Sequence, residues 1–344
     1  MNSLVGKNIL VTGSCGTVGS ELINQLLSDT NFNPAKIVGI DNNESELFFQ
    51  IEKYRNDVRA SFFICDIRDQ QCLEGHMQNI DVVFHCAALK HVILNEYSPS
   101  QTVSTNINGT QNVINAAKKE SVKIVVFTSS DKAVNPTNVM GTSKLMGERL
   151  MTAANNQQAA GDTVFTSTRF GNVLGSNGSV VQIFRNQIKK GGPLTITEED
   201  MTRFVMSVDQ AVGLVINSTL MAKGGEVFIT KMPVIQIVDL AKAMIKELAP
   251  QYGYKEKDIE IKVIGAKPGE KLYEELMSEE ETRRSVELEE FFAVLPAFRN
   301  IYCETEYNYP KVVSNSVSDS YVSSKQRFLS IDEIVDLLRV NELI

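Results

Sequence analysis

The chain has 344 residues, a formal net charge of −8 at pH 7 and a hydrophobic fraction of 43%. This length is more than one small core needs, so we expect one large domain or two closely joined domains. The acidic balance excludes a global electrostatic footprint for nucleic acid or an anionic membrane, and an anionic substrate would need a local basic cluster.

The first half of the chain alternates strand-like and helix-like segments. Apolar and β-branched runs predict strands at 7–11, 36–40, 61–64, 81–85, 123–127 and 164–169. Apolar residues at helical spacing predict helices over 18–27 and 105–119. This alternation predicts an α/β fold with a Rossmann-type doubly wound parallel sheet and right-handed crossovers.

The alternation becomes looser in the second half. Periodicity and turn signals predict a helix, a turn, a helix and a strand, in that order, at 180–190, 191–193, 209–221 and 226–229. The chain ends in a predicted amphipathic helix from Ser330 to about Leu343. Ser330 and Glu333 have the spacing of a capping box and open this helix.

These patterns predict two units. We expect a Rossmann domain of residues 1–178, to which 204–232 return, and a smaller C-terminal α+β domain, the cap, made of 179–203 and 233–344. The polar, Ser-rich segment 304–326 is either a surface excursion or an arm that contacts a partner.

The segment between the first predicted strand and the first predicted helix is rich in glycine. It reads Gly13-Ser14-Cys15-Gly16-Thr17-Val18-Gly19. Glycines let the backbone approach a pyrophosphate, and the start of the following helix offers unpaired N–H groups. The G-x-x-G-x-x-G spacing is one residue longer than the commonest dinucleotide fingerprint, but its place between a strand and a helix supports the same function.

Two acids follow the next two predicted strands. Asp41 ends the second strand about 20 residues after the last glycine, where an acid binds the adenosine ribose hydroxyls. Its carboxylate accepts from a 2′-hydroxyl and repels a 2′-phosphate, and no Arg or Lys follows in 42–46, so we expect NAD rather than NADP. Asp66, after the third strand, is either an acceptor for the adenine amino group or an ordinary turn residue.

Polar side chains gather directly after the predicted strand 123–127. They are the hydroxyls of Ser129 and Ser130, the adjacent acid and amine of Asp131 and Lys132, and, further on, the amine of Lys144. Ligands of open α/β sheets bind at the carboxyl ends of strands, and an adjacent acid and amine there can divide proton donation and acceptance. The same residues are also compatible with a capped helix N-terminus.

Cysteine usage and hydropathy indicate the compartment. No apolar run approaches the ~20 residues that span a bilayer, and the N-terminus lacks a signal-peptide pattern. No C-x-x-C pair occurs, so we expect no metal site, and we expect reduced, mostly buried thiols in a cytoplasmic protein without membrane insertion. The cysteines are Cys15, Cys65, Cys72, Cys86 and Cys303.

Together these motifs resemble the extended short-chain dehydrogenase/reductase superfamily and, within it, the UDP-N-acetylglucosamine 4,6-dehydratases of bacterial polysaccharide biosynthesis. The resemblance covers roughly residues 5–280. It rests on several blocks in one order: GSCGTVGS at 13–20, HCAALKHV at 85–92, TNINGT at 105–110, SSDKAVNPTNVMGTSK at 129–144, RFGNVLGS at 169–176, MTRF at 201–204 and KPGEKLYEEL at 267–276.

The resemblance implies roles for individual residues. Asn106 matches an internal helix residue that supports the active site, although an ordinary polar helix residue is the alternative, and Lys144 matches the lysine that bonds the nicotinamide ribose. The implied cofactor contacts are Gly13, Gly16, Thr17, Val18, Gly19, Asp41, Asp66, Ile67, Ala87, Ala88 and Lys144. The implied substrate contacts are Lys90, Asn172, Arg203 and Lys267, of which Arg203 and Lys267 could instead be surface cations.

The chain departs from the superfamily pattern at two positions. Met140 stands where a tyrosine is usual, four residues before Lys144, and a thioether has no proton to exchange. The methionine is familiar among retaining dehydratases, so it resembles a subfamily mark. Lys267 stands where arginine is usual, and it can bind a diphosphate only as a point charge.

The implied reaction is NAD-dependent dehydration of a UDP-N-acetylhexosamine, with UDP-N-acetylglucosamine favoured, to the 4-keto-6-deoxy sugar. We expect Asp131 to be the acid for the C6 hydroxyl, Lys132 the base at C5 if burial and Lys144 depress its pKa, and Ser130 the group that holds the C4 oxygen. Without a phenol at 140, Lys132 is the one strong candidate near C5, which predicts retention of configuration. A homo-oligomer is expected.

Three alternatives stay open from the sequence. They are a C5-inverting 4,6-dehydratase, a nucleotide-sugar 4-epimerase of the same superfamily, and a non-catalytic NAD-binding protein, for which Met140 is the one supporting feature.

Overall fold

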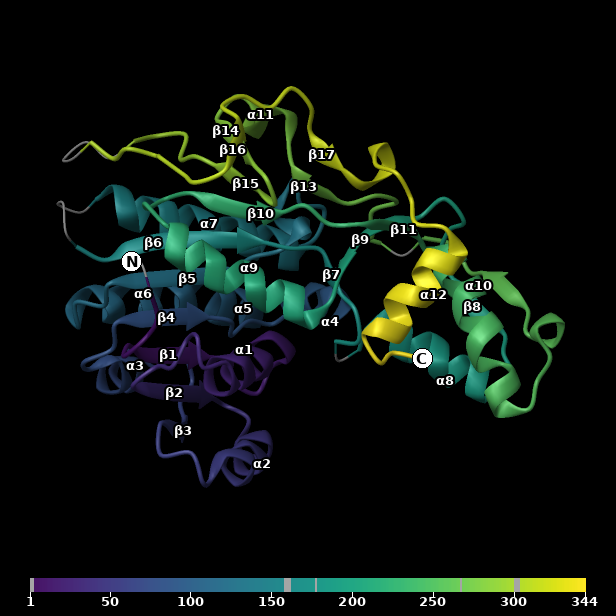
Figure 1. Cartoon of the computed structure of the whole chain (residues 1–344), viewed down its shortest axis with the longest axis horizontal. Coiled ribbons are helices and arrows are strands. Elements are labelled where there is room, and N and C mark those ends of the chain that lie inside the picture. Colours follow the sequence, from purple (N-terminus) through teal and green to yellow (C-terminus); the bar gives the residue numbers. More distant parts are fainter. Residues whose placement is uncertain (1–2, 158–161, 177, 267, 300–303) are drawn as a thin grey trace.

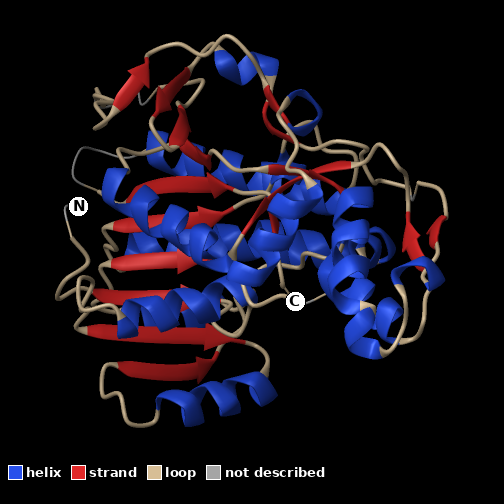
Figure 2. Ribbon diagram, turned by 45° about the vertical axis from the view of Figure 1, so that its right-hand side comes forward, coloured by secondary structure: helices blue, strands red, loops and turns tan. Residues whose placement is uncertain are grey.

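The computed structural model of the chain describes residues 3–157, 162–176, 178–266, 268–299 and 304–344. Within these ranges a ten-stranded sheet in the order β16-β14-β15-β10-β6-β5-β4-β1-β2-β3 forms the centre of the molecule. Helices cover both of its faces, and a smaller unit lies beyond the end toward which the parallel strands point (Figures 1 and 2).

Seven neighbouring strands of this sheet are parallel, and their order reverses between β1 and β4, as in a Rossmann fold. The central strands are apolar and buried on both faces, which explains why they read as continuous apolar runs. The predicted fold class is confirmed. The parallel strands are β1 (Asn8–Thr12), β2 (Lys36–Asp41), β3 (Ala60–Ile64), β4 (Val82–His85), β5 (Ile124–Thr128), β6 (Val164–Arg169) and β10 (Val227–Thr230).

The helices form two layers that bury different faces of the sheet. One apolar core joins α1 and α9 to the sheet, and another joins α3, α6 and α7 to it. Their starts and ends lie within a few residues of the predictions where one was made. The helices of this part are α1 (Thr17–Ser28), α2 (Glu44–Tyr54), α3 (Gln70–Met77), α4 (Val92–Tyr97), α5 (Pro99–Thr102), the π-helix η1 (Val103–Asn108), α6 (Gly109–Lys119), the 3₁₀ turn η2 (Asp131–Ala133), α7 (Val139–Asn156) and α9 (Val208–Met221).

Three antiparallel strands from the C-terminal part extend the same sheet. Strand β15 (Phe291–Val294) pairs with β10, β14 (Ser285–Leu288) pairs with β15, and β16 (Val312–Ser314) pairs with β14. The sequence analysis assigned all of 233–344 to the cap, and the structure differs here. The physical reason is that β10 would otherwise leave its edge unpaired, and β15 buries apolar side chains in the core of the main sheet.

The cap has its own apolar core and is joined to the sheet by short strands. The terminal helix α12 packs on α10, and its predicted capping box of Ser330 and Glu333 is present. The remaining elements are β7 (Asn172–Val173), α8 (Val180–Lys189), β8 (Leu194–Ile196), β9 (Thr202–Met206), β11 (Val234–Gln236), α10 (Ile237–Leu248), η3 (Pro250–Tyr252), η4 (Glu256–Asp258), β12 (Ile261–Val263), β13 (Glu275–Met277), α11 (Glu279–Thr282), β17 (Tyr321–Val322), η5 (Ser323–Lys325) and α12 (Ile331–Val340).

Two further expectations can be compared with the fold. The structure joins Cys65, after β3, to Cys72 on α3 in a disulfide, so the expectation of reduced thiols is wrong for this pair. The reason is a tight β3–α3 connection that brings their Cα atoms to 6.1 Å. Cys15 and Cys86 are free, and Cys303 lies outside the described residues. Among the helices of the described ranges, none combines the length and apolar character that crossing a membrane requires.

Candidate active site

The carboxyl edge of the parallel strands faces the cap (Figure 2), and several predicted site residues lie at this edge, at or shortly after the ends of β1, β2, β4 and β5. This edge carries the glycine-rich turn after β1 and the acid/amine pair after β5. It is also where the strand order reverses, the place at which open α/β sheets bind ligands.

The turn between β1 and α1 leaves no room for a side chain at Gly13 or Gly19. Gly13 has a φ of +67°, and a Cβ there would lie 2.7 Å from the backbone of Ala87. A Cβ at Gly19 would lie 2.2 Å from the Gly13 carbonyl oxygen. Helix α1 begins at Thr17 without a side-chain cap, so its first turn presents backbone N–H groups. This geometry fits a pyrophosphate.

Asp41 lies beside this turn. Its carboxylate accepts hydrogen bonds from the backbone N–H groups of Cys15 and Asn43, each at 3.0 Å. These bonds fix the carboxylate at the end of β2, next to the glycine turn, where a ribose diol would meet it.

Asp66 is already paired. The Arg68 side chain hydrogen-bonds to it, with the closest approach at 2.6 Å, and this bonding lowers the pKa of Asp66 to about 2 although burial opposes the shift. An adenine amino group would therefore share a charged acceptor with Arg68. Ile67 is buried against Gly109, where a Cβ would lie 2.7 Å from its side chain.

Asn106 lies on the π-helix η1, a type of helix that is frequent at functional sites. Its buried amide accepts from the Leu89 N–H at 2.8 Å and donates to the Leu89 carbonyl at 2.9 Å and to Ser143 Oγ at 2.9 Å. Asn106 thereby ties the segment after Ala87 and Ala88 to helix α7. This contact supports the role that the resemblance implied for it.

Helix α7 brings Lys144 against the end of β5. The buried Lys144 Nζ donates to the Thr128 carbonyl at 2.7 Å and lies 4.7 Å from the centre of the Phe127 ring. Burial lowers the pKa of Lys144 to about 8. Met140, one turn earlier on the helix, is also buried. A Cβ at Gly141 would lie 2.2 Å from the Lys132 carbonyl oxygen, so this glycine lets α7 approach η2.

Asp131 and Lys132 form an ion pair within η2. Lys132 Nζ lies 3.1 Å from Asp131 Oδ1, and Ser130 Oγ donates to the same oxygen at 2.7 Å. Asp131 is 1% exposed, and its other carboxyl oxygen, Oδ2, has no hydrogen-bond partner in the described structure. An unpaired buried carboxyl oxygen is costly for stability and is typical of a functional site.

A second carboxylate, which the sequence analysis did not single out, completes this cluster. Glu274 Oε1 lies 3.2 Å from Lys132 Nζ and 3.6 Å from Arg203 Nε. Glu274 precedes β13 and is buried, and its Oε2 also lacks a partner among the described residues. The signal that could have found it is its place in the block KPGEKLYEEL, one of the blocks on which the resemblance rests.

The condition set for Lys132 to act as a base, a pKa depressed by burial and Lys144, is not met. Burial opposes its charge, but the carboxylates of Asp131 and Glu274 outweigh burial and Arg203, and the pKa of Lys132 is raised. Lys144 is not among the groups that shift it. Without substrate, Lys132 is therefore an ammonium, and any role as a base needs a step that removes a proton from it.

The predicted substrate residues occupy different surroundings. Asn172 Oδ1 accepts from Lys132 Nζ at 3.4 Å, which places Asn172 in the cluster. Arg203 is 5% exposed and donates to backbone carbonyls, including that of Lys271 at 2.8 Å, so it is no ordinary surface cation. Lys90 lies exposed between β4 and α4, and Lys267 lies outside the described residues.

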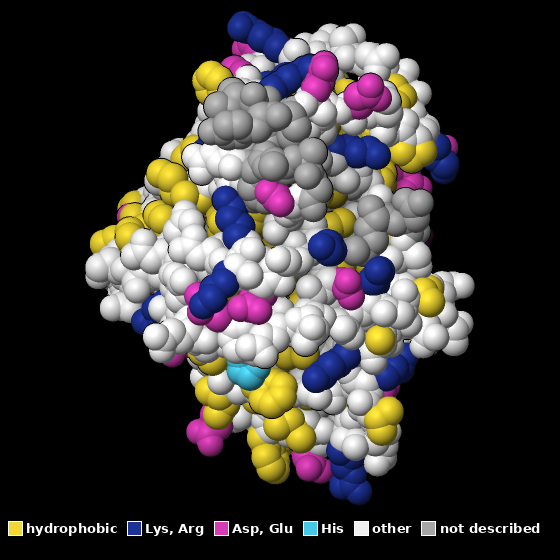
Figure 3. All heavy atoms as spheres, turned by 90° about the vertical axis from the view of Figure 1, so that its left-hand side faces the viewer, with side chains coloured by type: hydrophobic (Ala, Val, Ile, Leu, Met, Phe, Trp, Pro, Cys, Tyr) yellow, Lys and Arg dark blue, Asp and Glu magenta, His cyan; other side chains and the backbone are white. Residues whose placement is uncertain are grey.

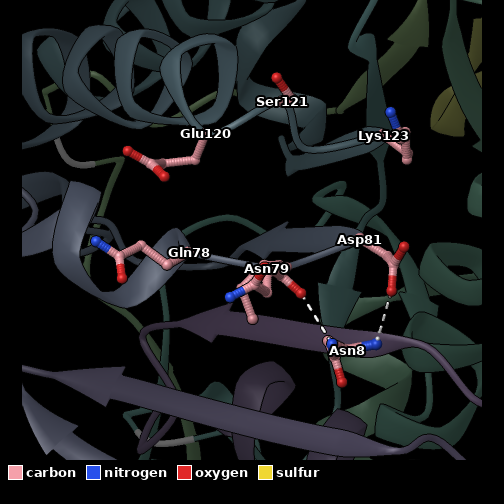
Figure 4. A pocket seen from close by; sticks show the side chains of 8 residues that line it. Asn8, Gln78, Asn79, Asp81, Glu120, Ser121 and Lys123 are labelled. Atoms are coloured by element: carbon pink, nitrogen blue, oxygen red, sulfur yellow. Dashed lines mark hydrogen bonds between the residues drawn. The ribbon is translucent and has the colours of Figure 1, made fainter.

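The opposite edge of the sheet offers no comparable cluster in the described structure. A shallow pocket of about 600 Å³ lies there, lined by Asn8, Asp81, Lys123 and neighbouring side chains, and none of its polar side chains is buried (Figure 4). Cationic and anionic side chains are intermixed across this end of the molecule (Figure 3). The candidate catalytic and binding residues of the described structure therefore lie at the carboxyl edge of the sheet.

The fold and this edge define an extended short-chain dehydrogenase/reductase. The family model described as "Polysaccharide biosynthesis protein" matches residues 9–296, and the chain belongs to that family.

Relatives of the chain include proteins named as nucleotide-sugar dehydratases and proteins named as epimerases. A UDP-N-acetylglucosamine 4,6-dehydratase (inverting) from Campylobacter jejuni is 36% identical over 343 residues, which are 98% of each chain. A UDP-glucose 4-epimerase from Rickettsia canadensis is also 36% identical, over 97% of this chain and 96% of the relative. The X-ray structure of Pen from Bacillus thuringiensis superposes with a TM-score of 0.90 at 40% identity and covers 99% of both chains.

Proposed function

We propose that the chain is an NAD-dependent nucleotide-sugar 4,6-dehydratase. Its best substrate candidate is UDP-N-acetylglucosamine, converted to the 4-keto-6-deoxy sugar with retention at C5 for surface-glycan biosynthesis. The observation that carries the proposal is the ion pair of the buried Asp131 and the half-buried Lys132, 3.1 Å apart after the carboxyl end of β5. A dehydration needs one acid and one base, and this pair can supply both.

The residues present fit NAD. The glycine turn leaves no room for a Cβ at Gly13, the first turn of α1 is open to a pyrophosphate, and Asp41 suits a free 2′-hydroxyl. When bound, NAD supplies the oxidation of the sugar at C4 and the later reduction at C6. Lys144 would hold the nicotinamide ribose.

The acid/base pair can be prepared by one proton transfer. Moving a proton from the Lys132 ammonium to the Asp131 carboxylate turns the ion pair into an amine and a carboxylic acid. Sugar binding expels water and favours this neutral pair, because a less polar site disfavours separated charges. Lys132 then takes the C5 proton, and Asp131 gives its proton to the departing C6 hydroxyl. Both residues return to their starting charges.

Two other groups have supporting roles. Ser130 donates to Asp131 at 2.7 Å, and in this proposal it holds the C4 oxygen of the sugar. The proton of the C4 hydroxyl leaves through Asp131, Ser130 or a bound water, since Met140 has no proton to exchange.

Retention at C5 follows from the same lack of a phenol. If Lys132 removes the C5 proton and one group returns it, return to the same face is the simplest outcome. The Campylobacter relative is named as inverting, so this stereochemical proposal separates the chain from that relative. The Rickettsia relative makes a 4-epimerase the second candidate, although epimerisation at C4 alone would leave the acid/amine pair without a task.

One experiment separates these functions. Protein is incubated with UDP-N-acetylglucosamine in deuterated water, and the products are followed by NMR. We expect UDP-2-acetamido-2,6-dideoxy-α-D-xylo-hexos-4-ulose with deuterium at C5 and unchanged ring couplings. An L-arabino product from the start contradicts retention, a C4 epimer identifies an epimerase, and no product indicates a non-catalytic protein.

The cofactor has a separate test. Purified protein is denatured and the released nucleotide is identified. We expect NAD(H), and release of NADP(H) would contradict the role of Asp41.

A further inference from the structure

Glu274 reaches the acid/base pair from a distant part of the sequence. Its Oε1 lies 3.2 Å from Lys132 Nζ, nearly as close as Asp131 Oδ1 at 3.1 Å. Lys132 therefore lies between two carboxylates, one from η2 and one from the segment before β13. The Glu274 side chain is 3% exposed, so solvent screens this interaction little.

The backbone around Glu274 is held without help from its carboxylate. The Glu274 N–H donates to Ser323 Oγ at 2.9 Å, and the Ser323 N–H donates to the Glu274 carbonyl at 2.9 Å. Two residues later, the Leu276 carbonyl accepts from Arg169 at 3.0 Å. The segment is thus anchored on both sides, and the buried carboxylate is an additional cost unless its charge has a use.

We propose that Glu274 is a positioning residue of the acid/base site, which acts through Lys132. It holds the amine against Asp131 and stabilises the ammonium that forms when Lys132 takes the C5 proton. This inference rests on the proposed dehydratase function. Glu274 needs no contact with the sugar, because it makes Lys132 a stronger base by favouring its protonated form.

The charged groups that face Lys132 set the expected effect. They are Asp131 on η2, Glu274 before β13 and Arg203 on β9, and Asn172 on β7 adds a neutral acceptor. Burial and the Arg203 guanidinium both lower the pKa of Lys132. Without the Glu274 charge, only the Asp131 carboxylate among these groups remains to raise it. The pKa of Lys132, which is raised in the intact cluster, should then fall.

The test measures that titration directly. The holoenzyme is labelled with ¹³Cε-lysine, the Lys132 signal is assigned with Lys132→Met, and its pKa is measured by NMR. We expect Glu274→Gln to lower the pKa of Lys132 by about one unit or more, and Glu274→Asp, whose carboxylate is withdrawn by one methylene, to lower it by less. The alkaline limb of kcat/KM should move to lower pH in step.

A neighbouring acid supplies a matched control. Glu275 accepts from Asn135 at 2.8 Å and lies 3.6 Å from Lys271, so Glu275→Gln removes a charge of the same segment that does not face Lys132. It should leave the Lys132 titration unchanged.

An unchanged Lys132 pKa in folded Glu274→Gln overturns the inference, as does an equal shift in Glu275→Gln. If Glu274→Gln does not fold, Glu274→Asp is measured in its place. A lowered Lys132 pKa in that variant supports the inference, and an unchanged pKa overturns it. The titration needs no sugar, so a wild-type protein that forms no 4-keto-6-deoxy product is recognised separately as a failure of the proposed function.

Discussion

Two buried ion clusters of this molecule differ in how completely they are paired. In the Arg169 cluster, Arg169 at the end of β6 binds Glu148 of α7 and Glu281 of α11, and all four carboxyl oxygens accept from its guanidinium at 2.6–2.9 Å. In the Lys132 cluster, formed by Asp131, Lys132, Arg203 and Glu274, each carboxylate keeps one buried oxygen without a partner in the described structure.

This difference indicates different tasks. Although burial opposes its charge, Arg169 has a raised pKa because Glu148 and Glu281 flank it, and Arg169 in turn lowers the pKa of Glu281 to about 2. Arg169 and Glu281 therefore keep their charges throughout the physiological pH range, and the cluster joins β6, α7 and α11. The Lys132 cluster has unused acceptors and an adjacent acid and amine, as expected where substrate must bind and protons must move.

The largest expected effect concerns the paired cluster. Arg169→Met removes the cation that binds all four carboxyl oxygens of the buried Glu148 and Glu281, and it leaves Glu281 the more distant Arg284 at 3.8 Å. The variant should lower the free energy of unfolding by about 3–5 kcal/mol, measured by urea titration. Arg327→Met, which removes a 74% exposed partner of Glu333, is the control and should leave the free energy of unfolding nearly unchanged. If both variants lower the free energy of unfolding by a similarly small amount, the Arg169 cluster does not have the structural role inferred for it.

The next effect concerns turnover in the unpaired cluster. Asp131→Asn and Lys132→Met should each reduce turnover by about a hundredfold or more, since each removes a positioned proton donor or acceptor. Circular dichroism should show an intact fold. If either variant keeps nearly the wild-type rate, the substituted residue does not have the catalytic role assigned to it.

Much of this site could be predicted from sequence because its parts are local. The glycine turn, Asp41, and the pair Asp131 and Lys132 each follow a strand directly, so strand prediction alone puts them at one edge of the sheet. The capping box of the last helix is local in the same sense.

The parts that sequence did not reveal depend on tertiary contacts. Glu274 lies more than 140 residues from Asp131 and meets it only because β13 pairs with β17 beside the main sheet. The extension of the sheet by β14, β15 and β16 likewise joins segments that local patterns treat separately. Burial lowers the pKa of Lys132, and Asp131 and Glu274 together raise it, so the part of this shift that comes from Glu274 could not be predicted from local patterns.

A smaller effect concerns Lys144, a buried cation that bonds a carbonyl and forms no ion pair among the described residues. Burial lowers its pKa from 10.5 to about 8 in the folded state. Between these pH values the unfolded chain binds more protons, so this burial cost is complete below pH 8 and disappears as the pH rises toward 10.5.

Lys144→Met should therefore be more stable than wild type at pH 7, by roughly 1–2 kcal/mol, with lower turnover. The difference in stability should shrink as the pH rises, and urea titrations of both proteins across the alkaline range measure it. A difference that does not change with pH would show that Lys144 is not destabilised by its burial.

The most direct test of the contrast between the clusters is the free energy of unfolding of Asp131→Asn beside that of Glu281→Gln, measured by urea titration of the two variants and wild type. Both changes neutralise a buried acid and leave the cation one carboxylate partner, Glu274 for Lys132 and Glu148 for Arg169. The two acids differ in their hydrogen bonds, because both Glu281 oxygens accept from Arg169, whereas Asp131 Oδ2 has no partner in the described structure. We expect Glu281→Gln to lose about 3 kcal/mol or more and Asp131→Asn to lose less than about 1 kcal/mol while its turnover collapses. Equal losses of stability in the two variants would contradict the account, because both clusters would then be structural.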